Sequence, residues 1–303
     1  IIKVFSFIGS FMFPKPLIGA ALMIFTCACF SGMSAIIREL AETISPFEIA
    51  FFRNALGLII IAPFFFSKGL KITRPISFRP FILRAVFGIL AMWAWYSALG
   101  LMPLAEAVAL NFTVALWMIP VAIIMLSEKV GVRRWIATFV GFGGVLIILQ
   151  PGAETISIGG FLAILSALLF AISMALVRII SKTESALSIV FWMHVFLTPL
   201  SIGPAIWFWS TPSHDELFLL GAVGGLATIG HYSMAKALSM AEATALTPLD
   251  FIRLPFAALI GYFMFSEIPA KTTWIGGAII IFSVFYISHR ENKMRSNSKN
   301  SLF

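Results

Sequence analysis

Residues 80–126 read PFILRAVFGILAMWAWYSALGLMPLAEAVALNFTVALWMIPVAIIML. The stretch consists of two apolar runs, 80–101 and 104–126, which are separated by little more than Met102 and Pro103. Each run has the roughly 20 apolar residues that a helix needs to cross the hydrocarbon core of a bilayer. Because the joint between the runs is only long enough for a turn, we expect two antiparallel membrane helices here.

Similar apolar runs lie along the whole chain between Pro, Gly and charged residues. The ten predicted helices cover residues 17–37, 46–66, 80–101, 104–126, 134–150, 159–180, 187–209, 217–239, 243–264 and 272–289. Of the 303 residues, 60% are hydrophobic and 11% are charged, whereas about a quarter of a typical soluble domain is charged. This composition excludes a soluble enzyme, a disordered chain and a secreted disulfide scaffold. It indicates an all-α polytopic membrane protein.

The Lys and Arg residues are unevenly distributed between the loops. With the N-terminus inside, 15 of the 21 fall in inside loops or termini, and two, Arg38 and Lys271, fall outside. The other four lie within predicted helices. Because basic residues collect on the cytoplasmic side of membrane proteins, we predict a multi-pass protein of the inner (plasma) membrane. The N-terminal segment 1–16 and the basic tail 291–303 are both predicted to be cytoplasmic. The Lys and Arg residues therefore indicate how the chain is oriented in the membrane, and no nucleic-acid partner is expected.

The two halves of the chain repeat an ordered set of residues at offsets of 136 to 140 positions. The matches are Gly19, Phe30, Ala35 and Arg38 with Gly159, Phe170, Ala175 and Arg178; Tyr96-Ser97 and Ala105-Glu106-Ala107 with Tyr232-Ser233 and Ala241-Glu242-Ala243; and Ser127-Glu128 and Trp135 with Ser266-Glu267 and Trp274. Since each half has an odd number of helices, the second half must cross the membrane in the opposite sense. Inverted repeats are typical of secondary transporters, whose substrate site lies near the midplane between the halves.

The ten helices and the repeated Tyr-Ser, Ala-Glu-Ala, Ser-Glu and Trp pattern resemble the EamA-domain branch of the drug/metabolite transporter superfamily. The resemblance implies one EamA repeat at 17–150, a second at 157–290, and a central cavity lined mainly by helices 1, 3, 4, 6, 8 and 9. Such transporters move small organic solutes in either direction. In addition, residues 46–54 (PFEIAFFRN) and 286–291 (YISHRE) are similar to the S-adenosylmethionine uptake branch.

The ninth helix carries the strongest candidate site, in the stretch TPLDFIRLP at 247–255. Asp250 and Arg253 are three residues apart and therefore share a helix face. One interpretation is a self-neutralised pair that serves packing. The other is a clamp for the carboxylate and amine of an amino-acid-like solute, because Pro248 and Pro255 bracket the pair and broken helices hold ligands in transporters.

The other candidate binding residues are polar or aromatic and lie on helices that the family resemblance assigns to the cavity. They are Asn111, Thr113 and Trp117 on the fourth helix, Trp93 and Tyr96 on the third, and His231 and Tyr232 on the eighth. Aromatic residues inside spans are also common packing and interface residues, and both roles stay open for Trp93, Trp117 and Tyr232.

Three further ionisable residues of the early helices need a partner or a function, because a charge inside a membrane helix is costly. Glu48 and Arg53 are not stacked on one helix face, so each is expected to pair with another helix as a structural pair or a gate latch. Asp250 is the first candidate for proton coupling, followed by Glu48 and His231. Arg84 is expected to extend toward the cytoplasmic interface. Cys27 and Cys29 are expected to be packing residues.

These observations predict a secondary transporter that moves a small organic metabolite by alternating access, with an amino-acid-like or S-adenosylmethionine-like solute as the leading candidate. The alternative is an exporter of hydrophobic or cationic compounds, which a free acid in the cavity would favour. An intramembrane enzyme is a remote third, since the sequence has no His-Glu-x-x-His motif and no nucleophile elbow. The expected partners are the solute and the lipid bilayer, and no cofactor or metal is expected. The sequence leaves the oligomeric state open, and a monomer would suffice.

Overall fold

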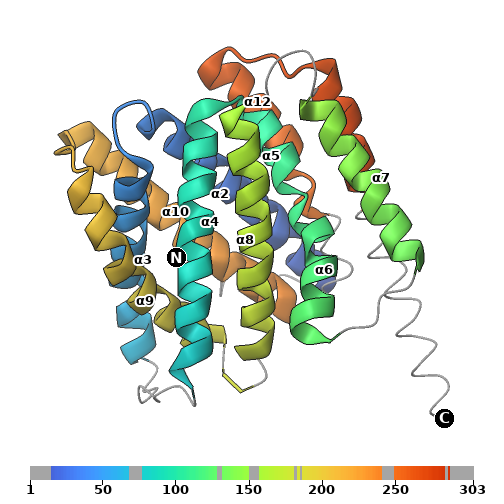
Figure 1. Ribbon diagram of the computed structural model, residues 1–303. Coiled ribbons are helices and arrows are strands. Elements are labelled where there is room, and N and C mark those ends of the chain that lie inside the picture. The colour runs from blue at the N-terminus through green and yellow to red at the C-terminus, as the bar shows by residue number, and fades with distance from the viewer. Residues whose placement is uncertain are drawn as a thin grey trace, which may run out of the picture.

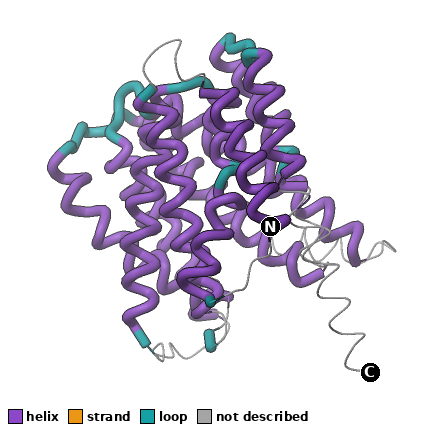
Figure 2. Tube along the Cα trace, turned by 45° about the vertical axis from the view of Figure 1, so that its right-hand side comes forward, coloured by secondary structure: helices purple, strands orange, loops and turns teal. Residues whose placement is uncertain are grey.

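The computed structural model describes residues 15–67, 77–127, 132–149, 157–180, 183–184, 186–240, 249–283 and 286. Within these ranges the chain is helical and contains no strand, and the helices run roughly along one common direction (Figures 1 and 2). The labelled helices are α2 (Lys15–Leu40), α3 (Pro46–Ser67), α4 (Phe78–Leu101), α5 (Leu104–Asn111), α6 (Val114–Leu126), α7 (Val132–Leu149), α8 (Ile158–Ile180), α9 (Ala186–Trp207), α10 (His214–Met240) and α12 (Arg253–Phe265).

These helices match the predicted spans closely. Seven stretches are long and apolar enough to cross a membrane, and one of them, Leu104–Leu126, consists of α5 and α6 together. Two shorter apolar helices cover Trp135–Ile148 and Arg253–Phe265, and residues 271–283 form a further helix. The prediction of an all-α membrane protein with ten spans is therefore confirmed. The expected joint at Met102 and Pro103 is present, since α4 ends at Leu101 and α5 begins at Leu104. The N-terminal segment, the basic tail and the joint at Ala241 lie outside the described residues.

The predicted fourth and ninth spans are not continuous helices. The fourth is divided into α5 and α6 at Phe112 and Thr113, and the ninth has a turn at Phe251 and Ile252 before α12 begins. Neither break falls on a proline: Pro120 lies within α6. Both breaks instead replace the regular helical bonds by bonds to the residue three positions earlier.

Two hydrogen bonds of each break correspond to each other at an offset of 139 positions. In the first half, the Thr113 nitrogen donates to the Leu110 carbonyl (3.0 Å) and the Ala115 nitrogen donates to the Phe112 carbonyl (3.2 Å). In the second half, Ile252 donates to Leu249 and Leu254 to Phe251, both at 3.1 Å. The Phe112 and Phe251 rings also meet edge to face, with their centroids 5.1 Å apart.

The ends of the two broken spans correspond as well. Ser127 follows α6 and Ser266 follows α12, and both adopt the left-handed backbone conformation, with φ values of 53° and 54°. The Ser127 nitrogen donates to the carbonyl of Ala122, and the Ser266 nitrogen donates to the carbonyl of Gly261. A left-handed residue at this position is a common helix ending. The sequence repeat is therefore also a repeat of local structure.

The most extensive helix contacts join the two halves to each other. α4 packs along α8, and α2 packs along α10; in Figure 1, α4 and α8 lie side by side. Further equivalent contacts join α6 to α8 and α12 to α2. The main apolar core therefore lies between the halves, where Tyr96, Leu104, Leu116, Leu220 and Ile280 are among the completely buried side chains.

Two glycines allow close backbone contact between α7 and the helix at 271–283. A Cβ atom added to Gly144 would lie 2.7 Å from the carbonyl oxygen of Gly276, and one added to Gly276 would lie 2.5 Å from the carbonyl oxygen of Gly144. Real Cβ atoms do not approach backbone this closely. The absence of side chains at both positions is therefore a condition of this helix pair, as in other membrane helix contacts.

Candidate functional site

The break in the ninth span places Asp250 and Arg253 together. Asp250 precedes the turn and Arg253 begins α12, and the Nη1 of Arg253 lies 3.8 Å from Oδ2 of Asp250. The Asp250 side chain is 36% exposed and the Arg253 side chain 16%. The Nε of Arg253 is buried and has no hydrogen-bond partner among the described residues. The predicted ion pair is therefore present, but it leaves part of each side chain available.

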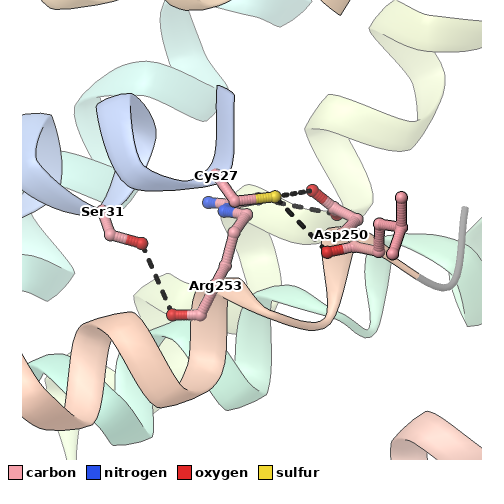
Figure 3. Close-up of polar contacts among 5 residues, drawn as sticks. Cys27, Ser31, Asp250 and Arg253 are labelled. Atoms are coloured by element: carbon pink, nitrogen blue, oxygen red, sulfur yellow. Dashed lines mark hydrogen bonds and ion pairs between the residues drawn. The ribbon is translucent and has the colours of Figure 1, made fainter. Parts of the chain in front are cut away.

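The first membrane helix, α2, supplies two further polar side chains to this pair. The Cys27 thiol lies 3.4 Å from the Leu249 carbonyl oxygen and 4.0 Å from Oδ1 of Asp250. The Ser31 hydroxyl donates to the carbonyl of Arg253 at 3.4 Å. Figure 3 shows these side chains pointing from α2 toward the start of α12. The thiol and hydroxyl thus add side-chain contacts from α2 to backbone carbonyls on both sides of the break.

Both cysteines of the chain are free and buried, so the prediction of unpaired packing residues is confirmed. The sequence alone assigned no site role to Cys27 or Ser31. Their position four residues apart on one face of a helix was the signal that could have indicated a shared contact.

Phe30 joins the Asp250–Arg253 pair to a second polar group. The guanidinium carbon of Arg253 lies 5.8 Å from the centroid of the Phe30 ring. On its other side, Phe30 meets the ring of His231 edge to face at 5.0 Å, and the Nε2 of His231 lies 3.2 Å from Nη2 of Arg53. Residues of α12, α2, α10 and α3 therefore form one continuous series of contacts between the two halves.

Arg53 and Glu48 each contact another part of the fold, as expected, and do not pair with each other. Arg53 donates to Oδ1 of Asn54 at 3.0 Å and lies 4.0 Å from the sulfur of Met92 on α4. Glu48 is completely buried, and its Oε2 accepts hydrogen bonds from the Ser210 nitrogen (3.1 Å) and hydroxyl (3.0 Å). Glu48 therefore ties α3 to the segment after α9.

The three candidates of the fourth span differ in their surroundings. Thr113 is completely buried, and its hydroxyl donates to the Leu110 carbonyl at 2.6 Å. This hydroxyl stabilises the break between α5 and α6, and the solute-binding role of Thr113 stays a prediction. Trp117 packs edge to face on Phe142 of α7 at 4.9 Å, and its indole nitrogen is buried without a partner among the described residues. Asn111 ends α5 and is partly buried.

The aromatic candidates of the third and eighth spans diverge. Trp93 packs edge to face on Phe47 at 5.1 Å, and its indole nitrogen finds no partner in the described part of the chain. Tyr96 is 2% exposed and belongs to the main core, whereas Tyr232 is 54% exposed. Tyr96 therefore packs in the core between the two halves, whereas the side chain of Tyr232 on α10 is exposed. The binding roles of both tyrosines stay predictions.

The family of EamA-like transporters matches the chain twice, over residues 17–150 and 157–289. The chain belongs to the EamA-like transporter family. Its two matched regions follow the two halves of the fold, and the repeated helix breaks and caps fall at equivalent places in each. As an EamA-like transporter it is an integral membrane protein that crosses the bilayer many times, and it is a secondary transporter of small metabolites rather than an enzyme.

Several named relatives match this chain over nearly its whole length. It is 32% identical to the S-adenosylmethionine uptake transporter of Rickettsia felis, over 94% of this chain and 97% of that protein. It is 29% identical to the riboflavin transporter of Vibrio cholerae, over 94% and 97%, and 26% identical to the pseudopaline exporter of Pseudomonas aeruginosa, over 89% and 95%. A solved protein structure matches with a TM-score of 0.60 at 16% identity, over 91% of this chain and 98% of that one, which supports the fold alone.

Proposed function

We propose that the protein transports a zwitterionic, amino-acid-like metabolite by alternating access and that this solute binds at the break in the ninth span. The observation that carries this proposal is the Asp250–Arg253 pair, whose partly exposed side chains are 3.8 Å apart. A carboxylate can take two parallel hydrogen bonds from a guanidinium group. An ammonium or sulfonium group can take the place of Arg253 as the partner of Asp250.

The balance of charge supports this solute class over a purely cationic one. Asp250 is already neutralised by Arg253, and Arg53 adds a positive charge on the other side of Phe30. A purely cationic solute that paired with Asp250 would leave Arg253 without an anionic partner, whereas a zwitterionic solute supplies one. Similarity to an S-adenosylmethionine uptake transporter makes S-adenosylmethionine, which is both zwitterionic and cationic at sulfur, the first solute to test.

The distribution of basic residues supports a location in the inner membrane with both termini in the cytoplasm. In this orientation α3 begins on the outer side and α4 begins on the inner side. Export stays a second candidate because a relative at 26% identity is named an exporter. Measuring transport in both directions across the same vesicles separates the two.

The test is uptake of radiolabelled S-adenosylmethionine into proteoliposomes that contain the purified full-length protein. We expect Asp250→Asn and Arg253→Ala each to reduce uptake by about tenfold or more, because each removes a charge-assisted contact to the solute. The matched controls are Asp215→Asn and Arg79→Ala, since both side chains are exposed at helix starts. These controls should keep wild-type uptake.

Two results would overturn the proposal. If Asp250→Asn and Arg253→Ala elute as aggregates while both controls stay monodisperse, the pair holds the fold together and is not the solute site. If all four variants transport at the wild-type rate, the solute binds elsewhere. If the wild-type protein takes up riboflavin but neither S-adenosylmethionine nor methionine, the zwitterionic solute class is wrong.

A further inference from the structure

We propose that Gly230 of α10 is a positioning residue for the solute site and that it acts through the ring of Phe30 on the guanidinium group of Arg253. The inference rests on the proposed function, in which Arg253 takes the carboxylate of the solute. It deepens that function by naming what orients the guanidinium group. Gly230 needs no contact of its own with the solute for this role.

Gly230 lies where α10 packs along α2. The Thr26 hydroxyl of α2 is 3.4 Å from the Gly230 carbonyl oxygen. A Cβ atom added to Gly230 would lie 2.6 Å from Cε1 of Phe30 and 3.0 Å from its Cδ1. A side chain at position 230 and the Phe30 ring therefore cannot occupy their places at the same time. We call the space over Gly230 that this ring fills the Gly230 notch.

The ring in the Gly230 notch contacts the solute site and α10 together. The guanidinium carbon of Arg253 lies 5.8 Å from the centroid of the Phe30 ring, within the roughly 6 Å range of a cation–π interaction. The ring of His231, the residue after Gly230, meets Phe30 edge to face at 5.0 Å. The position of the ring is therefore set by α10, and the ring in turn limits where the guanidinium group of Arg253 can lie.

The guanidinium group of Arg253 is otherwise held loosely. Its Nη1 lies 3.8 Å from Oδ2 of Asp250, which is longer than a hydrogen bond, and its Nε has no partner among the described residues. The hydrogen bond from Ser31 goes to the carbonyl of Arg253 and fixes the backbone alone. Since two parallel hydrogen bonds to a carboxylate require a defined orientation of the guanidinium plane, the Phe30 ring bears directly on solute recognition.

An alanine at position 230 would act on the ring rather than on the backbone. The two atoms nearest to the added Cβ both belong to Phe30, and the third, the Cβ of Cys29, is 3.4 Å away in van der Waals contact. Alanine also favours the helix over glycine. We therefore expect Gly230→Ala to keep the fold and to turn the Phe30 ring out of the Gly230 notch, which changes the orientation of Arg253.

The counterparts of these residues in the repeat differ from them. Gly230 corresponds to Ala94 at the offset of 136 positions, and Phe30 corresponds to Phe170 at the offset of 140. Phe170 is 43% exposed, whereas Phe30 is partly buried. The counterpart of Arg253, at the offset of the two breaks, is an uncharged valine. The glycine, the covered ring and the arginine therefore occur together, as expected if the contact serves the site.

The first experiment tests the Gly230 notch without any solute. Melting temperatures of the purified full-length protein are measured for Gly230→Ala in the wild-type background and in Phe30→Val, which lacks the two ring atoms nearest to the added Cβ. We expect Gly230→Ala to lower the melting temperature in the wild type and not in Phe30→Val, because contacting residues are not additive. Gly225→Ala is the matched control on the same helix, where an added Cβ meets nothing within 4 Å. Equal effects of Gly230→Ala in both backgrounds would overturn the notch.

The second experiment tests the positioning role. Affinities for S-adenosylmethionine and for its decarboxylated analogue are measured by calorimetry on the wild type, Arg253→Ala, Gly230→Ala and Gly225→Ala. We expect the wild type and Gly225→Ala to bind the analogue about tenfold more weakly. Gly230→Ala should lose most of this preference, as Arg253→Ala does, through weaker binding of S-adenosylmethionine alone. Weakening of both ligands by the same factor would mean that Gly230 has a structural role only.

Failure of the proposed function gives a different pattern from failure of this inference. If the wild type does not distinguish the two ligands, Arg253 is not the carboxylate partner, and the positioning role falls with the proposed function. If the wild type distinguishes them, Arg253→Ala does not, and Gly230→Ala does so as well as the wild type, the proposed function stands and Gly230 is not a positioning residue. Should Gly230→Ala aggregate, Phe30→Leu replaces it, since leucine removes the ring face without adding an atom at position 230.

Discussion

Glu48 and Asp250 are both carboxylates inside membrane helices, but their surroundings differ. Glu48 is completely buried and accepts two hydrogen bonds from Ser210, whereas the Asp250 side chain is 36% exposed beside Arg253. A buried carboxylate with fixed donors holds two segments together. A partly exposed one can exchange its partner for a solute. Of the two, Asp250 is therefore the better candidate for solute binding and coupling.

At this scale we predict that Glu48→Ala lowers the stability of the protein by about 1–3 kcal/mol, because it leaves the Ser210 nitrogen and hydroxyl without their acceptor. Glu48→Gln should lose less, since its amide oxygen can still accept. Thermal unfolding in detergent measures the difference. Glu42→Ala is the matched control, since Glu42 is exposed. Equal melting temperatures for Glu48→Ala and Glu42→Ala would show that the tie contributes nothing.

At the scale of elements, the contact between α7 and the helix at 271–283 depends on two glycines, which have no side chain to hold the backbones apart. Gly144 and Gly276 face each other's carbonyl oxygens, and a Cβ at either position would lie less than 3.0 Å from backbone. Gly143, which directly precedes Gly144 in α7, has no atom within 4 Å of an added Cβ. Adjacent glycines of one helix are therefore predicted to respond very differently to the same substitution.

We predict that Gly144→Ala lowers stability by about 1–3 kcal/mol, the usual range for overpacking, because the two helices must move apart. Gly143→Ala should be neutral or slightly stabilising, since alanine favours the helix. Melting temperatures of the two purified variants provide the measurement. A loss as large for Gly143→Ala as for Gly144→Ala would mean that helix propensity, and not the close contact, controls the outcome.

At the scale of the whole molecule, Glu267 joins the two halves on one side of the membrane. It forms an ion pair with Arg38 of α2, and its Oε2 accepts from the nitrogen of Leu104 at the start of α5 (3.0 Å). Arg38 also lies over the ring of Phe265, 4.5 Å from its centroid. One carboxylate of the second half is therefore bound to two helices of the first.

We predict that Glu267→Gln opens this side of the molecule more often, because the amide cannot pair with Arg38. Hydrogen–deuterium exchange at the first turn of α5, which begins at Leu104, should become faster. Exchange in the interior of α4 should not change. Asp215→Asn, at an exposed position, is the control. Unchanged exchange at Leu104 would show that the two halves stay closed without Glu267.

The sequence predicted most of the fold because apolar length and charged breaks are local signals. The spans, the joint at Met102 and Pro103, and the correspondence of the two halves were all readable from composition and spacing. The break in the ninth span falls between Pro248 and Pro255, the two prolines that bracket the predicted one, whereas the sequence did not predict the break at Phe112. The structure puts both breaks where backbone bonds to the third preceding residue replace regular helical bonds, and no residue type marks such a position.

The candidate site was predicted only in part. The pairing of Asp250 and Arg253 follows from a spacing within one segment, so it could be read directly. Cys27, Phe30 and Ser31 reach them from a helix more than 200 residues away in sequence, and no local pattern reports such contacts. The Thr113 hydroxyl binds the carbonyl of Leu110 in its own span, and the sequence does not distinguish such a hydroxyl from a free one.

The edge-to-face contact of Phe112 and Phe251 constrains how the two halves can evolve. The rings occupy equivalent positions of the repeat, yet each is the neighbour of the other. A substitution in one half therefore changes the environment of its own counterpart, and the two copies cannot drift apart independently at this point. Among divergent descendants of the same duplicated ancestor, these two positions should co-vary in size, with a smaller ring in one compensated by a larger side chain in the other.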